Sequence, residues 1–362
     1  MPVKRIFYLD GLRGIAILSV IFFHAYSRWH EIETFKQSHF FRIFFSYGFL
    51  GVHLFFAISG YVIYMSLRRS DNLLMFGFAR YLRLAPAMIV ASLFLYLTSF
   101  FIPERPSGQP NFQDFLPSIF FINPEFLTKI LGIYIQDLDG VFWSLYVEVK
   151  FYFISSVIFF ILRDKQLRGI VSLFILYLII EVLVRIGFGN IYVLFTKKIL
   201  SYLGVSYYGW FLLGIYSYKL SHFPSGHRCI YSLAFIFLIT VLAESMSNAG
   251  SIEILIASTV VALLFVYPLF SMNFKLILSS RALLFFGFIS YPLYLIHQNL
   301  VTGLAIKLHN SGFELPNFIY PLPFLVLAIL LSLLIAKLEP VIKNLFLKKV
   351  PTKLFGIKLF RK

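Results

Sequence analysis

Two ionisable side chains near the N-terminus have a spacing that would let them act together. Arg13 and His24 both lie in the mostly apolar stretch 11–29. Eleven residues at about 100° each place them within about 20° of one helix face, roughly 16 Å apart along the axis. A guanidinium can bind an anion there, and an imidazole can take a proton near neutral pH. Two structural alternatives stay open, because Arg13 can snorkel to the membrane surface and His24 can be a hydrogen-bonded packing residue.

Two later stretches carry polar groups that are costly in an apolar helix. Ser144 and Glu148 are one helical turn apart near the start of one stretch, and Tyr294 and His297 are three residues apart in another. Ionisable groups in membrane helices usually face a partner or a cavity, so each predicts a functional site. Counted from the expected helix ends, Glu148 and His297 lie at a depth similar to that of His24. A chance arrangement of structural polar residues is the alternative.

A pair of arginines suggests an anion site. Arg80 and Arg83 are one turn apart at the start of an apolar stretch. Guanidinium groups bind phosphate with paired hydrogen bonds, which makes a nucleotide phosphate a candidate ligand. The bias of basic residues toward the cytoplasmic side of membrane proteins explains the same residues equally well.

The composition shows what kind of chain positions these groups. Of 362 residues, 59% are hydrophobic and only 13% are charged, which is too little polar surface for a water-soluble core. Stretches of about 20 apolar residues predict an all-α polytopic integral membrane protein with about ten transmembrane helices. The predicted spans are 11–29, 44–67, 79–102, 142–162, 169–187, 201–218, 229–245, 252–271, 283–305 and 318–336. Residues 115–135 are expected to form a short re-entrant or interfacial piece.

The net charge of +16 supports an orientation rather than nucleic-acid binding. With ten spans and a cytoplasmic N-terminus, the inner segments hold more than twice as many Lys and Arg residues as the outer ones, so both termini are expected to be cytoplasmic. Residues 1–337 are predicted to form a single transmembrane domain, and 338–362 a basic amphipathic tail that meets membrane lipid. The only cysteine, Cys229, excludes an intramolecular disulfide and a multi-cysteine metal site, and no metal is expected.

Five motifs occur in an order that resembles membrane-bound acyltransferase family 3. They span residues from about 5 to 300, and together they are far more specific than any one alone. The motifs are Tyr8-Leu9-Asp10-Gly11-Leu12-Arg13-Gly14 with His24, the run from Gly48 to Gly60 that includes His53 and Ser59, Phe78-Ala79-Arg80-Tyr81-Leu82-Arg83 before Pro86, Trp143-Ser144-Leu145 with Glu148, and Ser290-Tyr291-Pro292 with His297. The family often has a second arginine at the position of Tyr81. The third arginine that would contact the donor, beside Arg80 and Arg83, is therefore missing from this motif.

The resemblance implies an O-acyltransferase in a bacterial inner (cytoplasmic) membrane. Such a protein moves an acetyl or other acyl group from cytoplasmic acetyl-CoA to a hydroxyl of a cell-envelope polysaccharide or a lipid-linked sugar, such as O-antigen, capsule or exopolysaccharide. The chain ends after the tenth predicted span, so the extracytoplasmic hydrolase-like domain fused to some members is not expected. The sequence predicts neither the acceptor sugar nor the oligomeric state.

The resemblance also assigns roles to residues. His24 is expected to be the general base, or in a variant mechanism the acyl-carrying nucleophile, and Glu148 either orients His24 or holds the acceptor. Arg13, Arg80 and Arg83 are expected to bind the donor. The expected substrate-binding residues are Asp10, Ser59, Trp143, Ser144, Tyr291 and His297.

Two other function classes fit the same pattern of polar residues. A flippase or transporter of lipid-linked sugars needs polar groups at mid-membrane and would move its substrate without modifying it. A non-catalytic subunit of an envelope assembly complex would tolerate replacement of Arg13 or His24. Transfer of labelled acetate to a glycan separates the acyltransferase from both.

Overall fold

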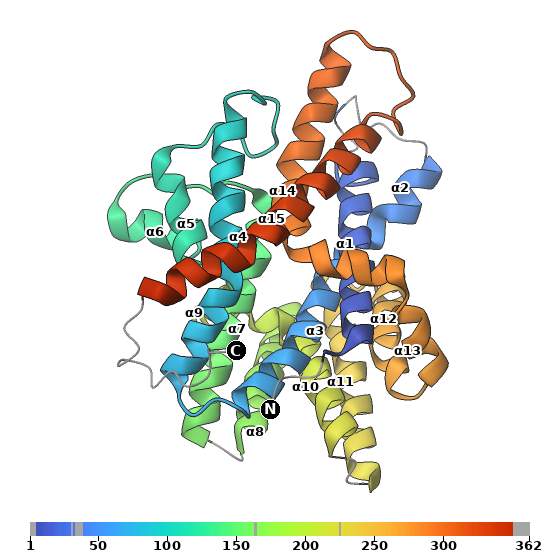
Figure 1. The fold of residues 1–362 in the computed structure, drawn as a ribbon. Helices are drawn as coiled ribbons and strands as arrows, with labels where there is room; N and C mark the ends of the chain where they lie inside the picture. The colour runs from blue at the N-terminus through green and yellow to red at the C-terminus, as the bar shows by residue number, and fades with distance from the viewer. Residues whose placement is uncertain (1–4, 30–31, 33–38, 163–164, 224–225, 350–362) are drawn as a thin grey trace. The chain divides into compact units, whose positions relative to one another are not determined.

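The computed structural model describes residues 5–29, 32, 39–162, 165–223 and 226–349. Every regular element within these ranges is a helix (Figure 1), which confirms the predicted all-α fold. The described residues fall into two compact units. Unit 1 combines Met1–Arg69 with Ser144–Ser290, and unit 2 combines Ser70–Trp143 with Tyr291–Lys362. Each unit therefore joins segments that are far apart in the sequence.

Unit 1 holds most of the helices. They are α1 (Phe7–Tyr26), α2 (His39–Ser46), α3 (Leu50–Leu67), α7 (Trp143–Leu162), α8 (Gln166–Arg185), α9 (Ile191–Tyr202), α10 (Tyr208–His222), α11 (Gly226–Ser247), α12 (Ile252–Val266) and α13 (Met272–Leu278). The centre of this unit is α3, which packs against α1 on one side and α10 on the other (Figure 1).

Small residues allow these helices to approach closely. A methyl group at Gly51 of α3 would lie 2.5 Å from the carbonyl oxygen of Ala16 in α1. A methyl group at Gly214 of α10 would collide with the carbonyl oxygen of Ala57 in α3. Only glycine fits such contacts, and small residues serve the same purpose in membrane helix pairs generally. The apolar sequence of α3 agrees with its place between two neighbours.

Unit 2 is built around two long helices. It contains α4 (Leu73–Ser99), α5 (Phe115–Phe120), α6 (Pro124–Leu131), the later part of α14 (Arg281–Asn310) and α15 (Pro321–Lys349). The Asn72 side chain caps α4 by accepting a hydrogen bond from the Met75 amide at 2.8 Å. Figure 1 shows α15 crossing α4, against which it packs.

The number of membrane spans agrees with the prediction. Eight helices among the described residues are long and apolar enough to cross a bilayer, and the number is ten if each of two bent helix pairs is one span. The bent pairs join α9 to α10 at 69° and α13 to α14 at 61°. They correspond to the predicted spans 201–218 and 283–305. The helices α5 and α6 of segment 115–135 are too short to span, while the orientation of the chain stays a prediction.

The last helix runs through the predicted boundary between domain and tail. α15 continues without a break from Pro321 to Lys349, past residue 338, and it contains Pro340. The later part of the predicted tail, 350–362, lies outside the described residues. The tail as a separate lipid-binding segment remains a prediction.

Candidate active site

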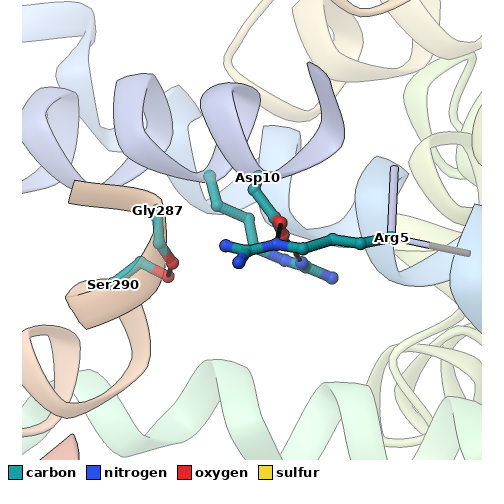
Figure 2. A network of polar contacts seen from close by, with 5 residues as sticks. Arg5, Asp10, Gly287 and Ser290 are labelled. Carbon is teal, nitrogen blue, oxygen red and sulfur yellow. Dashed lines mark hydrogen bonds and ion pairs between the residues drawn. The ribbon is translucent and has the colours of Figure 1, made fainter. Parts of the chain in front are cut away.

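An acidic residue at the start of α1 joins two arginines. The Asp10 carboxylate accepts a hydrogen bond from Arg13 at 2.6 Å through one oxygen and from Arg5 at 2.7 Å through the other (Figure 2). The Asp10 and Arg13 side chains are 14% and 19% exposed, whereas Arg5 is 55% exposed. Because one carboxylate bridges two guanidinium groups, the cluster keeps a net positive charge. It is therefore suited to an anionic ligand, and Arg5 is a member that the sequence interpretation missed.

The backbone around this cluster is fixed by close helix contact. A methyl group at Gly14 of α1 would collide with the carbonyl oxygen of Leu283 in α14, and one at Gly287 would collide with that of Asp10. Figure 2 shows Gly287 and Ser290 opposite Asp10, where the Ser290 hydroxyl donates to the Gly287 carbonyl at 2.8 Å. The start of α1 is thus held against α14 within unit 1.

His24 lies at the other end of α1, and its ring is anchored to its own helix. The ring Nδ1 lies 2.9 Å from the carbonyl oxygen of Val20, one turn earlier. A carbonyl oxygen can only accept, so Nδ1 carries the proton and the lone pair of the neutral ring belongs to Nε2. His24 is half-buried. The backbone therefore fixes the tautomer that a general base requires.

Glu148 is held by two hydroxyl groups from two helices. Its Oε1 atom accepts hydrogen bonds from Ser59 of α3 and from Tyr152, one turn later on α7. Ser59 and Glu148 are half-buried, and Tyr152 is 5% exposed. Both hydrogen bonds go to the same carboxylate oxygen. The structure thus brings together two predicted site residues and adds Tyr152, to which the sequence analysis assigned no role.

The register of α1 against α3 places Glu148 far from His24. The two helices run antiparallel, because Gly48 packs on Ser19 while Gly51 packs on Ala16. Continued along α3, this register puts Ser59, and with it Glu148, beside the first turns of α1. At about 1.5 Å per residue, Ser59 and His24 are on the order of 24 Å apart along the helix axes. The expectation that Glu148 and His24 share one depth is therefore wrong, and this separation gives no support to the predicted role of Glu148 in orienting His24.

The error has a physical cause at the start of α7. The depth of Glu148 was counted as if the residues before Trp143 lay at the membrane surface. Leu138 and Phe142 are instead fully buried, and Val141 is 3% exposed. Much of the segment before α7 is thus packed in the interior of unit 2 rather than at a surface, so distance from the helix start does not measure depth.

The two predicted donor arginines of unit 2 lie in different environments on α4. Arg80 is half-buried and its guanidinium lies 5.8 Å from the ring centre of Phe76. Arg83 is exposed and interacts electrostatically with Glu339 of α15. Between them, the Tyr81 hydroxyl donates to the carbonyl oxygen of Ile119 at 3.3 Å. The tyrosine that replaces an expected arginine thus ties α4 to segment 115–135.

The remaining predicted residues differ in accessibility. The Tyr291 hydroxyl donates to the Leu84 carbonyl at 3.0 Å, which links α14 to α4. His297 is 1% exposed, and its Nδ1 lies 2.9 Å from the Tyr294 carbonyl oxygen. Trp143 is 38% exposed at the start of α7, whereas Ser144 is buried. Their roles in substrate binding stay predictions.

Sequence interpretation missed a buried network in unit 2. Asp139 is fully buried, and its two carboxylate oxygens accept hydrogen bonds from the amides of Val141 and Asn299 at 3.1 Å each. Arg105 is 5% exposed and donates to the carbonyl oxygens of Leu95 and Leu138. Burial raises the pKa of Asp139 to about 7, although the two amides and the nearby Arg105 act in the opposite direction.

A second missed network lies in unit 1, on α3, α10 and α11. His53 Nε2 is 3.2 Å from a carboxylate oxygen of Glu244, which also accepts from the indole of Trp210 at 3.1 Å. The other oxygen of Glu244 accepts from Asn248 at 3.1 Å. His53 is 4% exposed and Glu244 is 8% exposed. The sequence singled out His53 but offered no signal for its partner, which lies 191 positions later.

Comparison with known proteins shows the family to which the chain belongs. A family model described as "Acyltransferase domain" matches residues 6–337. The chain is 27% identical over 362 residues to proteins named O-acetyltransferase OatA from Staphylococcus aureus strains NCTC 8325 / PS 47, COL and MRSA252. Each match covers 91% of this chain and 55% of the relative, so the chain spans about half the length of these relatives. No solved structure matches the chain significantly.

Proposed function

Because the chain belongs to the acyltransferase family whose model spans residues 6–337, we propose that it is an integral membrane O-acyltransferase. The acyl group is acetyl, as the name of the OatA relatives suggests, and the donor is acetyl-CoA. The acceptor is a hydroxyl of a cell-envelope polysaccharide or lipid-linked sugar, such as O-antigen, capsule or exopolysaccharide. The protein resides in a bacterial inner membrane.

His24 carries the proton transfer in this proposal. The acceptor hydroxyl gives its proton to Nε2 as its oxygen attacks the thioester carbonyl carbon. The new C–O ester bond forms, the C–S bond breaks, and the imidazolium returns the proton to the leaving thiolate. The observation that carries this assignment is the hydrogen bond between Nδ1 and Val20, because it leaves the basic lone pair on Nε2.

The donor phosphates are bound by arginines. Arg13 is the principal candidate in unit 1, where Asp10 holds it beside Arg5 in a cluster of net positive charge. Arg80 and Arg83 are the candidates in unit 2. Because Arg13 and His24 lie on one helix about 16 Å apart, a donor with phosphates at one end and a thioester at the other end of a long arm suits this separation.

Replacement of His24 tests the proposed base. We expect His24→Ala to reduce acetyl transfer by about 10²- to 10⁴-fold, the usual contribution of a general base. The assay compares envelope glycan mass, and the incorporation of labelled acetate, in cells with wild-type protein, the variant and no protein.

His222 supplies a matched control. Its Nδ1 lies 3.1 Å from the carbonyl oxygen of Tyr218, one turn earlier, so it makes the same local hydrogen bond on α10. His222→Ala should leave transfer within about twofold of wild type. Unchanged transfer by His24→Ala at normal membrane abundance would refute the base assignment. A wild-type protein that moves a glycan but adds no acetate would favour the flippase instead.

A further inference from the structure

We propose that the clamped carboxylate of Glu148 binds the phosphate-proximal part of the donor's arm, and that Tyr152 is the residue that positions it. The inference rests on the proposed function, because it concerns a donor of the coenzyme A class. It assigns Glu148 to the donor rather than to the acceptor sugar or to the support of His24. Three observations within unit 1 lead to it.

The first observation is the unequal use of the two carboxylate oxygens. Oε1 of Glu148 accepts both hydroxyl hydrogen bonds, from Ser59 and from Tyr152. Among the described residues, Oε2 has no hydrogen-bond partner, and the side chain is half-buried rather than enclosed. An ionised carboxylate only accepts hydrogen bonds. Oε2 is therefore oriented to receive an N–H or O–H group from a ligand.

The second observation is the position of this oxygen along unit 1. Through Ser59, Glu148 is level with the first turns of α1. The hydrogen bond to Asp10 draws the Arg13 guanidinium back toward this level, so the phosphates that Arg13 is proposed to bind, and the adjoining part of the arm, are expected there. Tyr8 of α1 and Tyr61 of α3 support the register, since their side chains interact electrostatically and Tyr61 is only two residues beyond Ser59. An acceptor hydroxyl that reacts at His24 is on the order of 24 Å away along the axes, which is beyond the reach of Glu148.

The third observation is charge. A carboxylate repels the phosphate groups that Arg13 is proposed to bind, so Glu148 needs a neutral hydrogen-bond donor as its ligand. The arm of coenzyme A carries a hydroxyl and an amide next to its diphosphate, and its thioester lies at the far end. Arg13 on the phosphates and Glu148 on the adjoining hydroxyl or amide would together select this class of donor.

A binding experiment separates the arm from the phosphates without any turnover. Purified protein in nanodiscs is titrated with coenzyme A and with adenosine 3′,5′-bisphosphate, which lacks the arm. Tyr152→Phe removes only the hydroxyl that orients Glu148, so we expect its affinity for coenzyme A to fall about 3- to 30-fold. Its affinity for the bisphosphate should be unchanged. Ser59→Ala should behave in the same way, whereas Arg13→Gln should lower the affinity for both coenzyme A and the bisphosphate.

Tyr208→Phe is the matched control. Tyr208 is a fully buried tyrosine of unit 1 whose hydroxyl has no hydrogen-bond partner among the described residues. Its removal should change neither affinity. An equal loss for both ligands in Tyr152→Phe, or no loss for either, would overturn the inference.

Steady-state kinetics provide the second readout. For Tyr152→Phe, the KM for acetyl-CoA should rise about as much as the affinity falls, with kcat and the KM for the glycan within about twofold of wild type. A rise in the KM for the glycan alone would overturn the inference and assign Glu148 to the acceptor. If the wild-type protein binds no coenzyme A, the proposed class of donor is wrong. If the wild-type protein binds coenzyme A and Tyr152→Phe binds it equally well, only the inference about Glu148 and Tyr152 is wrong.

Discussion

The two units contain buried carboxylates that make very different use of their hydrogen-bonding capacity. In unit 2, both oxygens of Asp139 accept backbone amides, and the residue is fully enclosed. In unit 1, Glu148 accepts two hydroxyl groups on one oxygen and has the other without a partner among the described residues. The first carboxylate completes its bonds within the fold, whereas the second has capacity left for a ligand.

The comparison shows how a polar network that stabilises the fold differs from a ligand-binding site in this protein. The bonds of Asp139 connect the segment before α7 to α14, and Arg105 connects the same segment to α4. These groups are costly to bury, so both oxygens of Asp139 and both terminal nitrogens of Arg105 are hydrogen-bonded. Glu148 is only half-buried, and only one of its two carboxylate oxygens accepts hydrogen bonds from the described residues. Changes in the first network should mainly affect folding, and changes in the second should mainly affect ligand binding.

Removal of Arg105 should have the largest effect on stability. Arg105→Ala would leave two buried carbonyl oxygens and the Asp139 carboxyl without their cationic partner. We expect a loss of about 3–5 kcal/mol, the usual consequence of breaking a buried charged network. Thermal unfolding in nanodiscs and membrane abundance measure it.

The exposed Arg281 is the control for this change. Arg281→Ala should stay within about 0.5 kcal/mol of wild type. A stable Arg105→Ala protein with normal abundance would show that the unit 2 network is not structural, and the contrast between the two units would fail.

The pH dependence of stability sharpens the same comparison. Burial raises the pKa of Asp139 to about 7, so folding favours its protonated form. Its stabilising contribution is therefore complete below the ordinary pKa near 4 and is lost as the pH rises through 7. The free energy of unfolding therefore changes by at most about 1.4 kcal/mol per pH unit between these two pKa values, and this dependence vanishes above about pH 8.

Asp139→Asn should remove this dependence. The stability of wild type relative to Asp139→Asn should therefore be greatest at pH 5 and should decline by about 2–3 kcal/mol by pH 7. Unfolding of both proteins between pH 5 and 8 measures the difference. A difference that stays constant over this range would mean that Asp139 has an ordinary pKa.

Local sequence patterns were sufficient to predict the helices and to predict which polar residues share one helix. Apolar stretches predicted the spans, and the eleven-residue spacing placed Arg13 and His24 on α1. These features depend on helical periodicity and bilayer thickness, which act over a few turns. Asp10 was predicted as a site residue from its motif, but its ion pairs with two arginines became visible only in the structure.

Contacts between distant segments could not be predicted in the same way. Asp139 is bonded to a residue 160 positions later, and no local pattern marks such a pair. The predicted depth of Glu148 was wrong because the true depth depends on how the preceding segment is buried, which is a property of the tertiary structure. Tyr152 follows Glu148 by one helical turn, so the sequence shows that the two can be neighbours. The hydrogen bond from Ser59, which is 89 positions before Glu148, depends on the fold, so the sequence does not show that both hydroxyl groups bind the same carboxylate.

A hydroxyl that has no partner provides the smallest and most specific test of the comparison. Tyr208 is fully buried, and its hydroxyl has no hydrogen-bond partner among the described residues, although the ring packs 5.2 Å from that of Phe151. An unpaired buried hydroxyl disfavours the folded state, so Tyr208→Phe should be neutral or more stable by up to about 1 kcal/mol. Tyr152→Phe removes a paired hydroxyl and should instead lose about 1 kcal/mol. Thermal unfolding of the two variants side by side measures the difference, and equal destabilisation would show that pairing does not distinguish these two tyrosines.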